Sequence, residues 1–535
     1  MKTPSRSLAC LTLAALAATA SAQDPILEAP GPIDIGQSSY VNLHGPTGYA
    51  YVKYAFGVIN PPLSLAYGDL WLAAPRFSFG AGAITGGTSN FFFFTVPSTS
   101  SLIGAEAWLE ALVNPTAPGP LVLSNGLLIR LGPLASAGPL QNVPFELFGR
   151  SLATGDHDAD GLDDLVVGVP GATTSAPSLN TAGKVSIYTG SSLSPVTSFA
   201  AGAPQGGENF GYSVALAQID GLFGDDLVVG GPLWDVSGTI VDAGRVHVYL
   251  SPSYTPTSGL TGTISFEFFG WKVDGIDFNG DGKDSLVVGA PASLGTGAGS
   301  VHVYDFAVGV WTPAYTLVEP AGGQAFGKRF AAGDWSSASG LELAVADPER
   351  PGSGFERGAV HVYAGTTPLP TLTSPSPIDY GHFGDGLAAG DFTGDGVDDL
   401  VVGAPGEGKV YIYSYTGVAW TLEDTVLQPG AAPSSTFGSD VLAADVDTDG
   451  ATDLVVGQIG SSGLGRAWVL FGTNGQALSK QLFGVIGHND TVSTLFGYSL
   501  ATGDLDGDGD LELYCGAPTT TTGFADSGKV FKATF

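Results

Sequence analysis

Apolar and polar positions alternate in short stretches along most of the chain. Runs rich in Val, Ile, Leu and Tyr are separated by turns rich in Gly, Pro and Asp. β-branched and aromatic residues favour strands, and Gly, Pro and Asp favour turns. The pattern therefore predicts an all-β protein with many short strands.

The dipeptide Phe-Gly recurs seven times from residue 148 onward, at intervals of 54 to 62 residues. Its phenylalanines are Phe148, Phe210, Phe269, Phe326, Phe383, Phe437 and Phe496. Each dipeptide precedes a short strand, an acidic turn, an apolar run, an alternating strand that begins at a glycine, and a less regular fourth strand. Four strands per unit, repeated radially, predict a seven-bladed β-propeller with four-stranded blades. A linear β-solenoid, the competing fold, has much shorter repeats.

The last unit ends soon after its third strand, Gly528–Phe531. An earlier segment must supply its fourth strand if the ring is to close and leave no exposed sheet edge. Leu140–Glu146 stand immediately before the first Phe-Gly. We expect them to pair with the last blade.

The N-terminus has the pattern of a signal peptide. Basic residues precede an apolar stretch, Leu8–Ala20, and the small-residue motif Ala20-Ser21-Ala22 predicts cleavage before Gln23. The stretch is too short to span a bilayer, and no later segment approaches the ~20 apolar residues that a spanning helix needs. We expect a secreted or cell-surface protein without a transmembrane segment.

Residues 23–135 do not follow the repeat, and they predict a small β-domain of unknown role that precedes a propeller over 136–535. Strands are expected at Tyr49–Val58, Phe91–Val96 and Leu121–Leu131, whereas Leu102–Val113 fits either a short helix or another strand. Gly132–Pro139 is rich in Gly and Pro, which is typical of a linker.

Composition supports a folded and acidic protein. Hydrophobic residues make up 44% of the chain, which favours a buried core over disorder. The net charge of −32 disfavours nucleic acid and anionic membranes as partners and suits cations, although acidity also promotes solubility by itself. Removal of the leader would leave Cys515 as the one cysteine, which predicts no internal disulfide and a buried, inert thiol.

The acidic residues gather about eight residues after each Phe. Units one, five, six and seven share a loop with oxygen-bearing side chains at positions 1, 3, 5 and 9, a Gly at position 6 and a free backbone carbonyl at position 7. Such a loop can supply the six to eight oxygen ligands that Ca²⁺ requires. The predicted ligands in these four sites are Asp156, Asp158, Asp160, Leu162 and Asp164; Asp391, Thr393, Asp395, Val397 and Asp399; Asp445, Asp447, Asp449, Ala451 and Asp453; and Asp504, Asp506, Asp508, Asp510 and Glu512.

The remaining units are weaker. Unit three offers Asp277, Asn279, Asp281 and the carbonyl of Lys283, but has Ser285 at position 9, which predicts a fifth site of lower affinity. Units two and four have lost the central ligand and are predicted to hold no metal. The alternative is that all these loops are acidic turns without metal. A metal with a saturated oxygen shell would support the structure and leave no position open for chemistry.

These motifs resemble a known family. Phe-Gly, the acidic loop and the tetrapeptide Val-Gly-Ala-Pro (Val288–Pro291 and Val402–Pro405) are similar to the FG-GAP repeats of the integrin α-subunit head. The resemblance implies a seven-bladed propeller with calcium loops on one face. It also implies extracellular binding of proteins or glycans.

No catalytic motif is present: G-x-S-x-G, H-E-x-x-H and a phosphate loop are all missing, and no catalytic residue is predicted. His247, His302 and His361 share one register, which predicts a role within the strands rather than a metal triad. His157, inside the first loop, is expected to point outward. The first hypothesis is a binding or adhesion scaffold for protein or carbohydrate ligands. The others are an extracellular hydrolase or lyase acting on polysaccharide or lipid, and a purely structural envelope protein.

Overall fold

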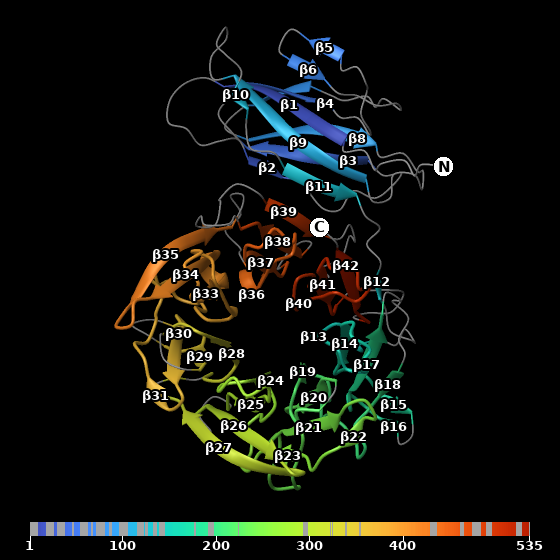
Figure 1. Ribbon diagram of the computed structural model, residues 1–535, viewed down its shortest axis with the longest axis vertical. Helices are drawn as coiled ribbons and strands as arrows, with labels where there is room; N and C mark the ends of the chain where they lie inside the picture. Colours follow the sequence, from blue (N-terminus) through green and yellow to red (C-terminus); the bar gives the residue numbers. More distant parts are fainter. Residues whose placement is uncertain are drawn as a thin grey trace.

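The computed structural model arranges seven sheets radially around a central axis as a closed ring (Figure 1). It describes residues 145–533 except for gaps, and within residues 1–144 it describes the backbone of twelve strands. The gaps are 176–177, 191–196, 223, 293–297, 321–322, 324, 337–339, 352–354, 429–435, 461–464, 473–482, 488–494 and 520–526. The predicted all-β class and the seven blades are confirmed.

Each blade is an antiparallel sheet, and its strands are given below in order from the centre of the ring outward. Blade 1 contains β13 (Leu152–Gly155), β14 (Asp164–Val169), β17 (Lys184–Thr189) and β18 (Thr197–Phe199). Blade 2 contains β19 (Ser213–Ala217), β20 (Asp226–Gly231), β21 (Arg245–Leu250), β22 (Thr255–Pro256) and β23 (Leu260–Thr261). Blade 3 contains β24 (Lys272–Ile276), β25 (Ser285–Ala290), β26 (Ser300–Ala307) and β27 (Val310–Val318). Blade 4 contains β28 (Arg329–Gly333), β29 (Glu342–Asp347), β30 (Ala359–Ala364) and β31 (Thr367–Pro368).

The last three blades follow the same plan. Blade 5 contains β32 (Leu387–Gly390), β33 (Asp399–Ala404), β34 (Lys409–Tyr415) and β35 (Trp420–Leu427). Blade 6 contains β36 (Phe437–Ala444), β37 (Asp453–Gln458), β38 (Arg466–Leu470) and β39 (Phe483–Gly487). Blade 7 contains β40 (Leu500–Gly503), β41 (Glu512–Ala517), β42 (Lys529–Ala533) and β12 (Ser136–Ala137). A short hairpin, β15 (Thr174–Ser175) and β16 (Ser178–Leu179), and a 3-10 helix, η2 (Pro405–Glu407), lie in connections between strands.

Ring closure uses a strand from before the first blade, as expected, but the segment differs. Ser136 pairs with Phe531 and Ala137 with Val530, antiparallel to β42. The prediction of Leu140–Glu146 is wrong: Phe145 and Glu146 form no strand, and residues 140–144 lie outside the described part. Strands are about 4.8 Å apart, so the chain must cross roughly 14 Å from the rim of blade 7 to the inner strand of blade 1. Several residues are needed for that crossing, which places the strand inside the segment predicted as a linker.

The core lies between blades. The seven Phe-Gly phenylalanines are at most 1% exposed and pack against strands of adjacent sheets. At the seam between blades 7 and 1, Phe148 lies in one cluster with Tyr514 and Val530. The second strand of each blade is almost wholly buried because a neighbouring blade covers each of its faces.

Backbones approach closely where blades meet. A Cβ added to Gly516 of β41 would lie 2.2 Å from the carbonyl oxygen of Gly149, which no side chain tolerates. Five other blades have the equivalent glycine in the same position. Blade 4 has Ala346 there instead. In the six blades that have it, the glycine therefore allows this close approach of the two backbones.

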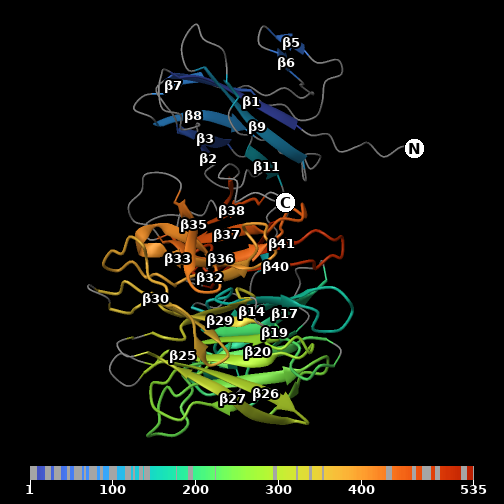
Figure 2. The same cartoon turned by 60° about the vertical axis from the view of Figure 1, so that its left-hand side comes forward.

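The N-terminal strands lie outside the ring of blades (Figures 1 and 2). They are β1 (Ala9–Ala17), β2 (Ile26–Glu28), β3 (Ser38–His44), β4 (Gly48–Lys53), β5 (Leu63–Leu65), β6 (Gly68–Leu70), β7 (Ala81–Ile84), β8 (Thr88–Thr95), β9 (Ala105–Asn114), β10 (Val122–Leu123) and β11 (Leu127–Leu131). The largest sheet has the order β10-β9-β1-β4-β7, with β11 also paired to β9, and a second sheet has the order β2-β3-β8. Of the two readings for Leu102–Val113, the structure shows the strand, β9.

The apolar stretch of the predicted leader forms β1, between β4 and β9. Cleavage before Gln23 and the domain boundaries stay predictions. Among the described residues, no helix has the length and apolar character needed to cross a membrane.

Candidate metal centres

The acidic loops occupy one end of the inner strands. In every blade the loop joins the end of the inner strand to the start of the second strand, as Asp156 to Asp163 do between β13 and β14. Because the inner strands all follow the same plan around the axis, the loops share one face of the ring. The structure brings three carboxylates together in the loops of blades 1, 6 and 7, with one oxygen from each within 4.8 Å of the others. These clusters are Asp156, Asp158 and Asp164; Asp445, Asp447 and Asp453; and Asp504, Asp506 and Glu512.

The carboxylate at position 1 organises each loop. In blade 1, Asp156 Oδ1 accepts a hydrogen bond from the Asp160 amide (3.0 Å) and Oδ2 accepts one from the Gly161 amide (3.0 Å). Gly161 has a φ of 89°, in the region that favours glycine, so the Gly at position 6 is required by the turn. The loop backbone thus wraps around one carboxylate and leaves the others free to converge.

The carboxylate at position 9 is the buried member of the cluster. Asp164 is 1% exposed, and its Oδ2 accepts hydrogen bonds from the amides of His157 (2.9 Å) and Asp158 (3.1 Å). Its Oδ1 is buried and has no hydrogen-bond partner among the residues that the structure describes. Burial, with repulsion from Asp158 added, raises the pKa of Asp164 to about 7.

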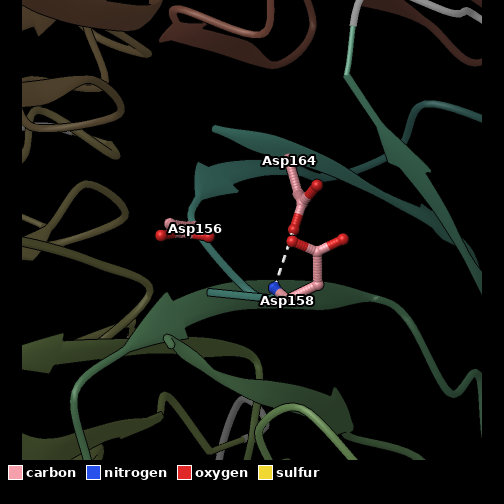
Figure 3. Close-up of side chains that lie close together, drawn as sticks. All are labelled: Asp156, Asp158 and Asp164. Carbon is pink, nitrogen blue, oxygen red and sulfur yellow. Dashed lines mark hydrogen bonds between the residues drawn. The ribbon is translucent and has the colours of Figure 1, made fainter. Parts of the chain in front are cut away.

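A cation would satisfy this arrangement. Figure 3 shows Asp164 directly above Asp158, with Asp156 beside them. A buried oxygen without a partner, next to two more carboxylates, is costly unless a positive ion neutralises it. Oxygen-only donors around a flexible loop favour a hard cation such as Ca²⁺ over transition metals. The residues present in this loop therefore fit the group that the sequence predicts.

The other two clusters differ in what holds position 9. Asp453 Oδ1 accepts a hydrogen bond from the Gly472 amide (2.6 Å), and burial raises the pKa of Asp453 to about 7. In blade 7, Lys532 Nζ lies 2.6 Å from Glu512 Oε1 and 3.4 Å from Asp506 Oδ2. That ammonium group neutralises part of the cluster, so a cation entering blade 7 competes with a lysine.

The predicted sites in blades 3 and 5 do not form a cluster of three carboxylates. Thr393 and Asn279 stand at position 3, and Ser285 stands at position 9 of blade 3. Both loops still fold around their first aspartate: Asp391 and Asp277 each accept amide hydrogen bonds on both oxygens. These two loops keep the predicted shape with fewer charges.

Position 5 takes a structural role in this structure. The Oδ1 atom of Asp160 accepts the Leu162 amide (2.9 Å), and the same bond recurs in the loops of blades 3, 5, 6 and 7. The assignment of these aspartates, and of the carbonyls at position 7, as ligands stays a prediction.

Sequence reasoning missed a contact that links neighbouring loops. The aspartate at position 8 reaches back to position 1 of the preceding blade. Asp163 Oδ2 accepts the Asp504 amide (2.9 Å), and the Asp163 amide donates to the Asp504 carbonyl (3.2 Å). The same paired contact joins Asp284 to Gln218 and Asp398 to Asp334. A repeated aspartate just before position 9 was the available signal.

The expectation that His157 points outward is wrong. The residue is fully buried, and its Nδ1 lies 2.6 Å from the carbonyl oxygen of Asp225 in the next blade. Its ring also packs against Tyr254, with 4.6 Å between ring centroids. The side chain at position 2 faces the neighbouring blade because alternate loop residues point to opposite sides, and the ligand positions occupy the other side.

The repeated histidines have partners within the blades. His247 Nε2 lies 2.8 Å from Glu208 Oε1, and His302 Nε2 lies 3.7 Å from Glu267 Oε1. His361 contacts Arg350 and Thr371, and burial together with Arg350 lowers the pKa of His361 to about 4. The strand role predicted for these three residues is confirmed. Cys515 is also buried as expected, and burial raises the pKa of its thiol.

Comparison with known proteins agrees with this architecture. The FG-GAP repeat family matches residues 148–188, 269–304, 383–420 and 496–531, which cover parts of blades 1, 3, 5 and 7. The chain contains FG-GAP repeats. The seven-bladed ring with an acidic loop in each FG-GAP blade is consistent with the integrin α-subunit propeller, the resemblance expected from the motifs.

Individual relatives match part of the chain. Integrin alpha-5 of Xenopus laevis is 34% identical over 167 residues, which are 30% of this chain and 15% of the integrin. Integrin alpha-IIb of Mus musculus is 31% identical over 243 residues, 42% of this chain and 23% of the integrin. Phosphatidylinositol-glycan-specific phospholipase D of Bos taurus is 31% identical over 202 residues, 33% of this chain and 24% of that enzyme. The matches thus span under a quarter of each relative.

A solved structure of an exotype rhamnogalacturonan lyase aligns with a TM-score of 0.40 and 11% identity, over 98% of this chain and 89% of the lyase. A likeness this weak carries no argument about activity.

Proposed function

We propose that this protein is a secreted, calcium-binding FG-GAP propeller that acts as an extracellular binding or adhesion scaffold for protein or glycan ligands. The observation that carries the proposal is the set of three carboxylate clusters on one face of the ring, each with a buried acid at position 9. A divalent cation would neutralise such clusters, and extracellular calcium is abundant enough to fill loops of moderate affinity.

Two further observations support the scaffold. The relatives that match the repeats include several integrin α-subunits. The chain also starts with the pattern of an export signal, and its strong acidity disfavours nucleic acid as a partner. Calcium in the loops would hold the blade turns in place, while ligand contacts would come from connections that vary between blades.

An extracellular hydrolase or lyase is the alternative, supported by the match to a phospholipase D. The described histidines of the repeated register pair with nearby side chains, and Cys515 is buried. An enzyme would need its catalytic groups elsewhere.

The test is an array of glycans and extracellular proteins, probed with the labelled protein in calcium and again after chelation. Specific binding that is lost with the chelator supports the scaffold. Turnover of a polysaccharide or glycolipid by the same preparation, without stable binding to any array member, would contradict it and favour the enzyme.

A further inference from the structure

A pocket of about 340 Å³ lies on the axis of the ring. The inner strands and the residues just before them supply its lining from all seven blades. Aromatic and basic side chains come from the position immediately after Phe-Gly, as with Arg150, Tyr212, Trp271 and Tyr498. This position precedes each inner strand, whereas the acidic loops follow it. The aromatic end of the pocket and the metal loops are therefore at opposite ends of the inner strands.

Arg150 is held between two tyrosines. Its guanidinium carbon lies 4.2 Å from the ring centroid of Tyr212 and 4.3 Å from that of Tyr498. Stacking on both faces fixes the plane of the guanidinium and leaves its N–H donors at the edge. Among the described residues, no hydrogen bond or ion pair of this side chain is found. The donors therefore face the pocket without an acceptor from the part of the chain that the structure describes.

The other cations of the pocket are paired. Lys272 lies 3.2 Å from Asp274, and Arg329 donates from Nε to the Asp385 carbonyl (3.1 Å) with Asp440 close by. Arg150 is the cation of this pocket that has no carboxylate partner among the described residues. An anionic ligand from outside the chain would satisfy its donors.

We propose that this pocket binds a sugar that carries a single carboxylate, a hexuronic acid residue, with its carboxylate on the Arg150 guanidinium. The fork of an arginine matches a carboxylate in two parallel hydrogen bonds. The volume is at the lower end of ligand pockets and suits one sugar ring rather than a folded partner. Asp274 and Asp440 line the same space and accept hydrogen bonds from sugar hydroxyls.

The surrounding charge narrows the ligand further. Lys272 and Arg329 offset the two acids, so the lining keeps one net positive charge, that of Arg150. One carboxylate balances this charge, whereas a polyanion exceeds it and is repelled by the acidic surface. A terminal uronate therefore fits better than a sulfated glycan or an acidic peptide. The assignment rests on the proposed extracellular binding role and names the ligand class for one of its surfaces.

The experiment uses the full chain in calcium, with galacturonic and glucuronic acid as probes in calorimetry and ligand-observed NMR. Galactose, glucose and the methyl ester of galacturonic acid are the matched ligands without the charge. We expect the uronates to bind and the neutral sugars and the ester to bind at least about tenfold more weakly. The ester comparison needs no variant, so it stands even if a substitution disturbs folding.

Variants locate the site. Arg150→Gln should weaken uronate binding by at least about tenfold, and Arg150→Lys should restore only part of it because the fork is lost. Arg357→Gln is the control, since Arg357 pairs with Asp379 (3.0 Å) away from the pocket. Equal binding of uronate and ester, no binding at millimolar concentration, or tighter competition by an acetylated aspartate peptide would each overturn the assignment. If the array yields a calcium-dependent ligand while uronates fail, the pocket assignment falls and the scaffold stands.

Discussion

Removal of divalent cations should lower the melting temperature of the propeller substantially. Each cluster in blades 1, 6 and 7 places three carboxylate oxygens within 4.8 Å of one another. Without a cation, the buried acid at position 9 of blades 1 and 6 either keeps its proton or remains charged beside two like charges. Either state lowers the free energy of unfolding, and a cation in the loop removes this destabilisation. In blade 7, Lys532 neutralises only part of the cluster.

The size of the effect follows from linkage. A ligand at one hundred times its dissociation constant stabilises the folded state by about 2.7 kcal/mol per site, so three filled clusters contribute about 8 kcal/mol. A domain of about 390 residues has an unfolding entropy of about 0.8 kcal/mol per degree near its melting point. The expected difference is therefore about 10 °C between calcium and chelator.

Differential scanning fluorimetry with calcium, chelator and magnesium measures this difference directly. Asp158→Asn and Asp447→Asn should each remove about a third of the calcium-dependent shift, because each disables one cluster. Asp220→Asn, at the same position in the blade 2 loop, is the matched control and should leave the shift intact. A melting temperature that is the same in calcium and chelator, together with no calcium binding by calorimetry, would refute the reasoning.

Three other predictions follow from the same structure. Gly516→Ala should destabilise the ring by more than about 2 kcal/mol, since its Cβ would lie 2.2 Å from a backbone oxygen of blade 1; a denaturant midpoint equal to that of the parent would contradict this. A chain that starts at residue 140 should have a lower melting temperature than one that starts at residue 130, because it lacks the strand Ser136–Ala137. Equal melting temperatures would show that the strand does not close the ring. The stabilisation by calcium should grow as the pH rises. Asp164 and Asp453 have pKa values raised to about 7 in the metal-free fold, whereas aspartate in the unfolded chain has a pKa of about 3.9. The metal-free protein therefore loses stability as the pH rises between these two values. Calcium binds the ionised carboxylates, so its stabilising effect increases over the same range. Melting curves at acid and alkaline pH, with and without calcium, measure both trends, and a calcium shift that is independent of pH would contradict them.

The repeat could be predicted because its chemistry is local. Phe-Gly, the loop glycine and the apolar second strand each need particular residues at fixed spacing, so the blades and their order were visible in the sequence. The loop shape was visible for the same reason, since Asp156 and Gly161 lie within one turn.

What lay between blades could not be predicted. The closing strand Ser136–Ala137 has little strand character of its own, and its position depends on the width of the ring. His157 was expected to point outward from its place inside the first loop, whereas it contacts Asp225 of blade 2, 68 residues away in the sequence. Arg150 gave no signal either, since its stacking partners come from blades 2 and 7.

The contact between Asp163 and Asp504 has a consequence for how the ring assembles. Asp504 is the first acid of the blade 7 loop, and its backbone is bound by the loop of blade 1. An ion that fixes the conformation of Asp504 therefore also fixes the junction between the first and last blades of the propeller. The joining of these two blades would respond to the ionic composition of the compartment where folding is completed.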